Sequence, residues 1–284
     1  MAENNMTLIT TVLPIALGII MLGLGLSLTL EDFRRVLRGP KAVLLALITQ
    51  MVVLPVVAVL LSLFFSLPPD LAIGMMILAA SPGGATANLF SHLAHGDVAL
   101  NLTLTAVNSL LSIVTLPLIV NFSVSFFSDR DQTLGMMFQK FAEVFAIVVL
   151  PVAVGMFIRS RRKSLADSLD KTVRIFSFAF LLAIIVGALI KDWKTVAEFL
   201  PQVGGAVLAF NLLSLGFGYG LPKLFRIEDR QATAIAMEVG IHNGALAMFV
   251  AIAILGSVTM ATPAAIYSLL MLLTAGIAAW LLRA

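Results

Sequence analysis

The chain contains no cysteine among its 284 residues. This absence excludes a disulfide framework, thiol chemistry and metal sites built on thiolates. Charged residues are also scarce: they make up 12% of the sequence, whereas soluble domains carry about 25%. Because the net charge is only +3 and most of its carriers fall in predicted loops, we expect no nucleic-acid surface. Nothing in the sequence indicates an obligate protein partner.

The chain is instead rich in long apolar runs. Hydrophobic residues make up 60% of it, and its mean hydropathy is +1.07. Runs of ~20 apolar residues are typical of membrane-spanning helices. The start, Met1 to Met6, has an acidic residue, no Lys or Arg and no small-residue cleavage site, so we expect no removable signal peptide. The sequence therefore predicts an all-α membrane protein, a single unit over residues 1–284 within the lipid bilayer.

The hydropathy pattern predicts nine transmembrane helices with short connections. Their expected ranges are 6–29, 41–66, 70–95, 97–127, 134–158, 172–191, 198–225, 229–255 and 258–283. The linker 30–40 is amphipathic, and we expect it to lie along the membrane interface.

Lys and Arg are placed very unevenly along this pattern. Fourteen of the 18 follow the first, fifth and seventh predicted helices or end the chain. The other side of the membrane receives only four, namely Arg130, Lys140, Lys191 and Lys194. Because positive loops stay in the cytoplasm, the sequence predicts a multi-pass protein of the inner or plasma membrane. Its amino terminus would lie outside and its carboxyl terminus inside.

Two polar segments, 81–88 and 238–243, interrupt the apolar runs. From Leu71 to Pro82 is about 18 Å at ~1.5 Å per residue, or about half of a bilayer core that is about 30 Å thick. The two interrupted helices, the third and eighth, are expected to run in opposite directions and to cross. Such a pair is typical of inverted-repeat transporters. The expected break points are Pro82, Gly83, Gly84 and Gly240.

Glu238 is the principal candidate for function. An ionisable side chain at this depth is costly unless it faces protein or water, and it marks a functional site by default. A protonated carboxyl that only bonds a neighbouring helix is the alternative. For Asn88, Asn101, Thr105 and Asn108, hydrogen bonding between helices is the alternative to a site role.

The two breaks resemble those of the bile acid:sodium symporter family. Residues 81–89, followed by 95–100, are similar to its Pro-Gly-Gly-x-x-x-Asn break and Gly-Asp turn. Residues 238–243 are similar to its Glu-x-Gly-x-Gln-Asn break, and Gln50 before Pro55 matches a further position. The likeness covers nearly the whole chain. The bacterial members have ten helices, and the resemblance implies that this chain lacks the first, as nine-helix animal members do.

The resemblance implies a sodium-driven symporter that takes up an organic anion, bile-acid-like or a small carboxylate, by alternating access. It implies a core domain (41–127 and 198–284) and a panel domain (1–40 and 128–197). It implies no catalytic residue, no cofactor and no metal beyond the coupling sodium. The first implied sodium site has Asn88, Asn101, Thr105 and Glu238. The second has Gln50, Glu238, Val239, Ile241 and His242. The implied substrate residues are Thr86, Asn88 and Asn243.

Three residues depart from the family pattern. Ala87 stands where the family has a hydroxyl residue, and Asn101 replaces a serine but keeps an oxygen ligand. His242 replaces glutamine, and imidazole nitrogen is a poor partner for a hard cation. Proton coupling through Glu238 and His242 is therefore an alternative. A passive channel is disfavoured because no ring of like residues occurs, and an enzyme because no nucleophile motif occurs.

Overall fold

The computed structural model describes residues 2–84, 86–128, 134–169 and 193–283, with residues 172, 173, 175, 176 and 179 between them. Over this part of the chain the fold is helical, with one isolated β-bridge between the segments that link helices. The helices are α1 (Ala2–Ser27), α2 (Leu30–Arg38), α3 (Pro40–Ile48), α4 (Leu54–Phe64), α5 (Pro69–Ala80), α6 (Thr86–Leu93), α7 (Val98–Phe127), α8 (Leu134–Arg161), α10 (Trp193–Leu224), α11 (Asp229–Gly240), α12 (Gly244–Phe249) and α13 (Val258–Leu281). Two π-helical turns, η1 (Thr49–Val53) and η2 (Val250–Ile254), continue α3 into α4 and extend α12.

Four stretches of the described chain are long and apolar enough to cross a membrane. They are Pro40–Phe64, Val98–Phe127, Phe199–Leu224 and Val258–Leu281. Each agrees with a predicted helix to within a few residues, and the chain is a multi-pass membrane protein as its composition predicts. The predicted helix 172–191 lies outside the described residues except for five scattered positions, so the count of nine stays a prediction.

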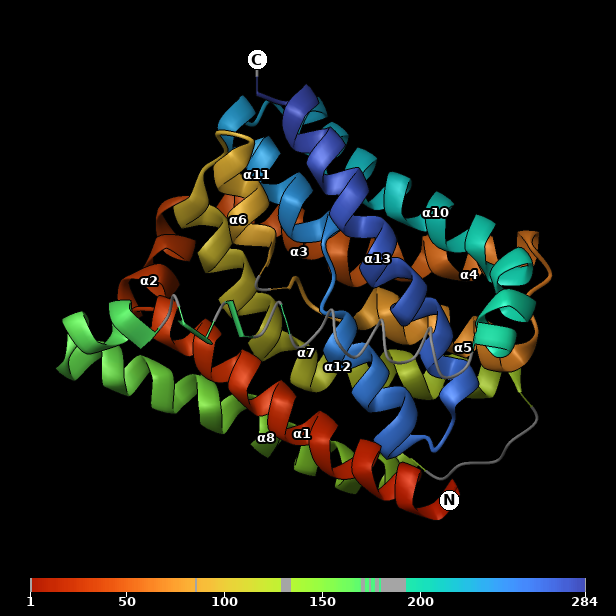
Figure 1. Ribbon diagram of the computed structural model, residues 1–284. Helices are drawn as coiled ribbons and strands as arrows, with labels where there is room; N and C mark the ends of the chain where they lie inside the picture. Colours follow the sequence, from red (N-terminus) through yellow and green to blue (C-terminus); the bar gives the residue numbers. More distant parts are fainter. Residues whose placement is uncertain are drawn as a thin grey trace.

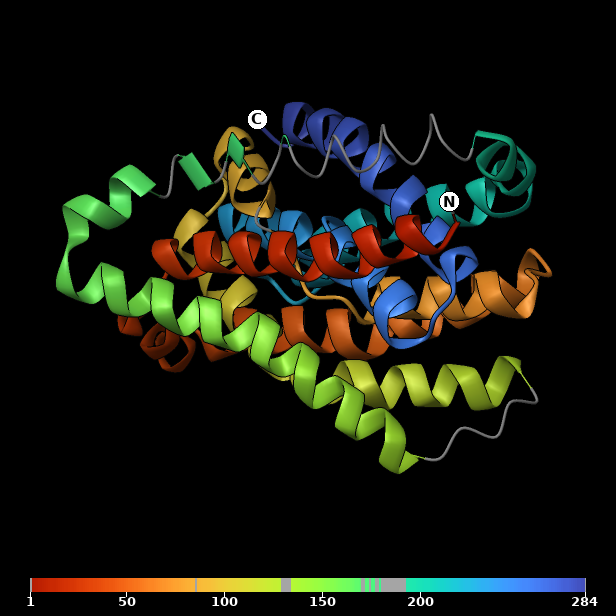
Figure 2. The same ribbon diagram turned by 60° about the horizontal axis from the view of Figure 1, so that its bottom comes forward.

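Helices α1 and α8 lie side by side along one edge of the molecule (Figures 1 and 2). Two glycines let their backbones meet. A Cβ atom at Gly25 would overlap the backbone of Val152, and one at Gly155 would overlap the backbone of Leu22 and approach Leu26 too closely. Small residues are enriched at such contacts because association of helices in lipid depends on close packing.

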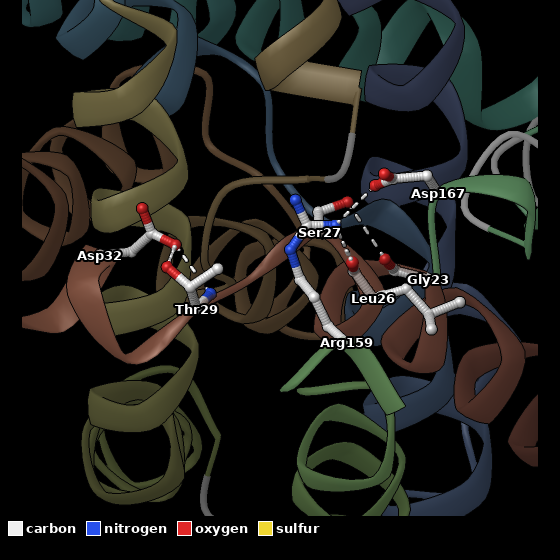
Figure 3. Close-up of polar contacts among 7 residues, drawn as sticks. All are labelled: Gly23, Leu26, Ser27, Thr29, Asp32, Arg159 and Asp167. Carbon is white, nitrogen blue, oxygen red and sulfur yellow. Dashed lines mark hydrogen bonds and ion pairs between the residues drawn. The ribbon is translucent and has the colours of Figure 1, made fainter. Parts of the chain in front are cut away.

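The C-terminal end of α1 is held by Arg159 of α8 (Figure 3). Its Nη1 donates to the carbonyl oxygen of Leu26 at 2.8 Å and to the Asp167 carboxylate at 3.1 Å. A cation is favourable at this end because the last carbonyls of a helix carry partial negative charge. Just beyond, Thr29 donates its backbone N–H and its hydroxyl to Asp32 Oδ2, both at 2.7 Å. These contacts fix the junction between α1 and α2.

The predicted amphipathic linker forms α2. Phe33 and Val36 pack against the core, whereas the side chain of Arg34 is 72% exposed. This helix packs against α7, and its Arg34 side chain points away from the core.

The centre of the molecule is where the chain passes from α5 to α6 and from α11 to α12 (Figure 1). Helix α11 packs against α6, α7 and α10, and α13 packs against α5, α10 and α12. All residues in 71–80 of α5 and in 232–240 of α11 are buried. A helix that is buried on all sides is surrounded by protein. The ends of α5 and α11 therefore meet deep inside the molecule.

Candidate functional site

Two short segments pass each other at this centre. We call 81–84, which follows α5, the first link and 241–243, which joins α11 to α12, the second link. Two backbone hydrogen bonds join them, from Gly84 N to Ile241 O (2.8 Å) and from Asn243 N to Pro82 O (2.9 Å). Backbone groups that leave a helix at membrane depth need partners within the protein. Each link supplies partners for the other.

The glycines predicted as break points are needed for close contact. None of Gly83, Gly84 and Gly240 has a positive φ. A Cβ atom at Gly83 would overlap the Glu238 carboxylate. One at Gly84 would lie 3.1 Å from the carbonyl oxygen of His242, and one at Gly240 would overlap Leu215. Gly83 therefore lets the first link pass directly against the acidic side chain.

Glu238 lies in the last turn of α11 and is fully buried. The Thr105 hydroxyl donates to its Oε2 at 2.5 Å, and Asn108 Nδ2 donates to its Oε1 at 3.1 Å. Within the described residues no Lys, Arg or His forms an ion pair with it. The carboxylate is held by neutral donors alone.

Side-chain oxygens without partners gather on the helices around this carboxylate. Asn88 Oδ1 on α6 and Asn101 Oδ1 on α7 are buried and accept no hydrogen bond. The Asn101 amide nitrogen donates to the Ala234 carbonyl at 2.8 Å, which fixes its side chain against α11. A buried acceptor without a donor is costly. A hard cation prefers such oxygens, so the first predicted set has the ligand chemistry that sodium needs.

The second predicted set also comes together, with a different arrangement of polar atoms. Gln50, in η1, donates its amide to Ala79 O at 3.2 Å and to Ser81 O at 3.0 Å. His242 Nδ1 lies 3.0 Å from the same Ser81 oxygen. Since a carbonyl only accepts, Nδ1 carries the proton in this contact. The Ser81 oxygen thus faces two N–H donors, and such donors repel a cation.

Aromatic rings enclose His242 on two sides. Its ring centroid lies 5.5 Å from that of Phe210 and 5.2 Å from that of Tyr267, and its Nε2 is buried without a partner. The Tyr267 hydroxyl and Asn211 Nδ2 donate to Gly240 O at 2.8 and 3.2 Å. This carbonyl at the end of α11 is therefore occupied by protein donors.

The predicted substrate residues lie beside the links. Thr86 is half-buried at the start of α6, and Asn243 is 6% exposed. Asn243 Oδ1 accepts the N–H of Leu246 at 3.0 Å, so this oxygen caps α12. A small cavity of about 10 Å³ adjoins the first link and is lined in part by Gln50, Pro82, Asn108, Ser112 and Thr115. A cavity of this size holds about one water molecule.

A larger cavity, of about 660 Å³, lies at the far end of α5 beside Asp70, Phe126 and Thr259. The whole length of α5 separates it from the links, so we do not connect it with Glu238.

A model of the Sodium Bile acid symporter family matches residues 14–199, which is more than half of the chain. The chain belongs to this family. Its relatives are transporters, and its function is transport and not catalysis. The expected family, and with it the absence of an enzyme activity, is confirmed.

Individual members of the symporter family resemble the chain over most of its length. "Uncharacterized sodium-dependent transporter YocS" of Bacillus subtilis is 31% identical over 92% of this chain and 80% of its own. "Probable sodium/metabolite cotransporter BASS1, chloroplastic" of Arabidopsis thaliana is 28% identical over 89% of this chain and 62% of its own. "Sodium/bile acid cotransporter 4" of Homo sapiens is 28% identical over 80% of this chain and 52% of its own. The chain spans less than two thirds of the last two relatives.

Sequence reasoning on this symporter left the role of Asn108 open and missed two polar residues near the links, Asn211 and Tyr267. Asn108 was open to a purely structural reading, yet it lies three residues after Thr105 on the same face of α7 and bonds the same carboxylate. That spacing was a usable signal. Asn211 and Tyr267 were not singled out, because a lone polar residue in an apolar helix does not show which backbone carbonyl it meets.

Proposed function

We propose that the chain is a secondary active transporter that couples the uptake of an organic anion to sodium. The observation that carries this proposal is the buried Glu238 carboxylate, which has neutral donors only and lies beside unpartnered oxygens. The names of the relatives, which include sodium-dependent, metabolite and bile acid transporters, support it.

The proposed cation site contains Glu238, Thr105, Asn88 and Asn101. A sodium ion there neutralises the carboxylate and gives partners to the two asparagine oxygens. The ion also draws α6 and α7 toward the end of α11. Ala87, which is fully buried, offers no side-chain oxygen, so the set is one ligand smaller than the family pattern. The second set, around Gln50 and His242, stays a prediction: the buried Oε1 of Gln50 has no partner, whereas the N–H donors at Ser81 disfavour a cation there.

In this proposal, α5 with α6 and α11 with α12 are two broken transmembrane helices of opposite direction. Each break places a helix N-terminus, with its partial positive charge, beside the links. The organic anion binds near Thr86, Asn88 and Asn243, on the side of the links that faces the panel domain.

Transport then follows from movement of the core domain (41–127 and 198–284) against the panel domain (1–40 and 128–197). The close packing of α1 on α8 suits a panel that moves as one body. Nine membrane helices place the amino terminus outside and the carboxyl terminus in the cytoplasm, in an inner or plasma membrane.

Proton coupling is the second candidate, and the unpartnered Nε2 of the buried His242 favours it. In this version Glu238 and His242 carry protons in place of sodium. A proton gradient without sodium would then drive uptake, which separates the two candidates.

The test is uptake into proteoliposomes of labelled cholate, pantoate and pyruvate, under imposed sodium or proton gradients. We expect at least one anion to accumulate with inward sodium and to fail with potassium. Glu238→Gln should abolish the sodium dependence, while Glu228→Gln, an acidic residue outside the links, should leave it intact. Uptake that does not depend on sodium and is unchanged in Glu238→Gln would overturn the proposal. Uptake that neither saturates nor leads to accumulation would indicate a passive channel.

A further inference from the structure

Asn108 touches both the proposed cation site and the space beside it. It is 1% exposed, and its Nδ2 donates to Glu238 Oε1 at 3.1 Å. The same residue lines the small cavity that adjoins Pro82, together with Ser112 and Thr115. The resemblance assigns it no role in either proposed site.

The two polar atoms of the Asn108 amide are used unequally. Nδ2 bonds the carboxylate, whereas Oδ1 is buried and accepts no hydrogen bond. An amide held on one side only is free to turn, since the terminal torsion of asparagine is broad. Thr105 differs, because its hydroxyl donates to Glu238 and keeps lone pairs for a cation.

We propose that Asn108 couples the cation to the organic anion by giving its N–H to one of two alternative acceptors. Without a cation, the acceptor is Glu238. With a cation at Glu238, the acceptor is a carboxylate oxygen of the anion, which enters the small cavity beside Ser112 and Thr115 while the rest of the anion lies near the proposed substrate residues Thr86, Asn88 and Asn243. This inference rests on the proposed function and adds the residue that links its two ligands.

Electrostatics gives this exchange its direction. A sodium ion on the carboxylate repels the positive end of an N–H dipole, so the bond between Asn108 and Glu238 weakens when the ion binds. The incoming anion is then the stronger acceptor, because hydrogen bonds to charged groups are about twice as strong as neutral ones. An anion that takes the donor leaves Glu238 with one donor fewer and thereby favours the cation. Each ligand raises the affinity for the other, as linkage requires.

The test compares wild type with Asn108→Ala, and uses Thr103→Val as the matched control. Thr103 is also buried on α7, but its hydroxyl bonds only Ala99 O in its own helix. Two quantities are measured. The first is the half-stabilising sodium concentration, at which the Tm of the anion-free protein has risen by half of its maximal increase. The second is the KM for uptake of cholate, pantoate and pyruvate at low and at saturating sodium.

In Asn108→Ala we expect the half-stabilising sodium concentration to stay equal to or fall below that of wild type. The anion KM at saturating sodium should rise roughly tenfold or more, as for loss of a hydrogen bond to a charged group, and should no longer depend on sodium. Thr103→Val should match wild type in both quantities. If Asn108→Ala does not fold, Asn108→Ser is measured in the same way.

Two results would overturn the inference. One is a KM in Asn108→Ala that keeps its wild-type dependence on sodium. The other is a tenfold rise in the half-stabilising sodium concentration of Asn108→Ala, which would make Asn108 a cation ligand through Oδ1. In both cases sodium-driven uptake by wild type leaves the proposed function standing. Absence of that uptake in wild type overturns the proposed function itself, and this inference with it.

Discussion

The hydroxyl of Thr105 lies 2.5 Å from Oε2 of Glu238 and 3.0 Å from the carbonyl oxygen of Asn101. A hydroxyl has one proton and two lone pairs. Because a carboxylate is a stronger acceptor than a carbonyl, the proton points to Glu238 and the lone pairs stay available. One small side chain thus supports the acidic residue and offers an oxygen to a cation.

Replacing Thr105 by valine should weaken sodium binding. The change keeps the shape of the side chain but removes both the donor and the oxygen, and an unsatisfied buried partner costs about 1–3 kcal/mol. We expect the sodium concentration for half-maximal uptake to rise roughly tenfold, since about 1.4 kcal/mol is a factor of ten. Thr105→Ser, which keeps the hydroxyl, should stay close to wild type. An unchanged sodium curve in Thr105→Val would remove this residue from the site.

Gly83→Ala should disrupt the links. The added methyl group would overlap the Glu238 carboxylate, which hydrogen bonds from Thr105 and Asn108 of α7 hold in place. Overpacking of this kind costs about 1–3 kcal/mol, so we expect a lower Tm in detergent and no sodium-driven uptake. Gly216→Ala is the control, because a Cβ atom there meets nothing within 4 Å. A Gly83→Ala protein with wild-type Tm and uptake would contradict the packing argument.

The helix ends at the links were predictable because local chemistry sets them. Pro82 lacks the N–H that would continue α5, and the sequence places it two residues after Ala80, where α5 ends. The acidic residue was predictable in the same way, since a carboxylate in an apolar run is costly wherever it lies. The resemblance implied that Thr105 and Glu238 belong to the same sodium site, and in the structure their side chains are in contact.

The partners in these hydrogen bonds were not predictable. Whether Asn108 reaches Glu238 depends on how α7 and α11 are aligned, and no hydrophobic period sets that alignment. The same holds for His242, whose Nδ1 meets Ser81 O only because the links cross at this register. The role of Gly25 and Gly155 in the close contact of α1 and α8 was not predictable either, because the sequence does not show which helix packs against each glycine.

His242→Gln should change the number of sodium ions that act together. The imidazole presents an N–H to Ser81 O, whereas a glutamine can present its oxygen beside Gln50 and supply a cation ligand. We expect the Hill coefficient for sodium to rise from about 1 toward about 2. The measurement is the initial rate of uptake as a function of sodium concentration at fixed pH. Asn211→Asp is not a suitable control because it adds a charge. Phe210→Leu, which keeps the pocket apolar, is the better control and should keep the wild-type coefficient.

Equal Hill coefficients in wild type and His242→Gln would contradict this account of the second set. A loss of proton-driven uptake in His242→Gln would instead favour the proton-coupled candidate.

Gly155→Ala should loosen the pair of α1 and α8 while leaving the cation site alone. The new methyl group would overlap the Leu22 carbonyl, so the helices must separate, at a cost of about 1–3 kcal/mol. We expect a Tm several degrees lower, measured in detergent without sodium. The rise in Tm on adding sodium should equal that of wild type, because this rise depends on affinity at Glu238. Val154→Ala, at a side chain that is 51% exposed on the same helix, should leave both values unchanged. A smaller sodium effect in Gly155→Ala would mean that α1 and α8 contribute to the cation site, against the division into core and panel.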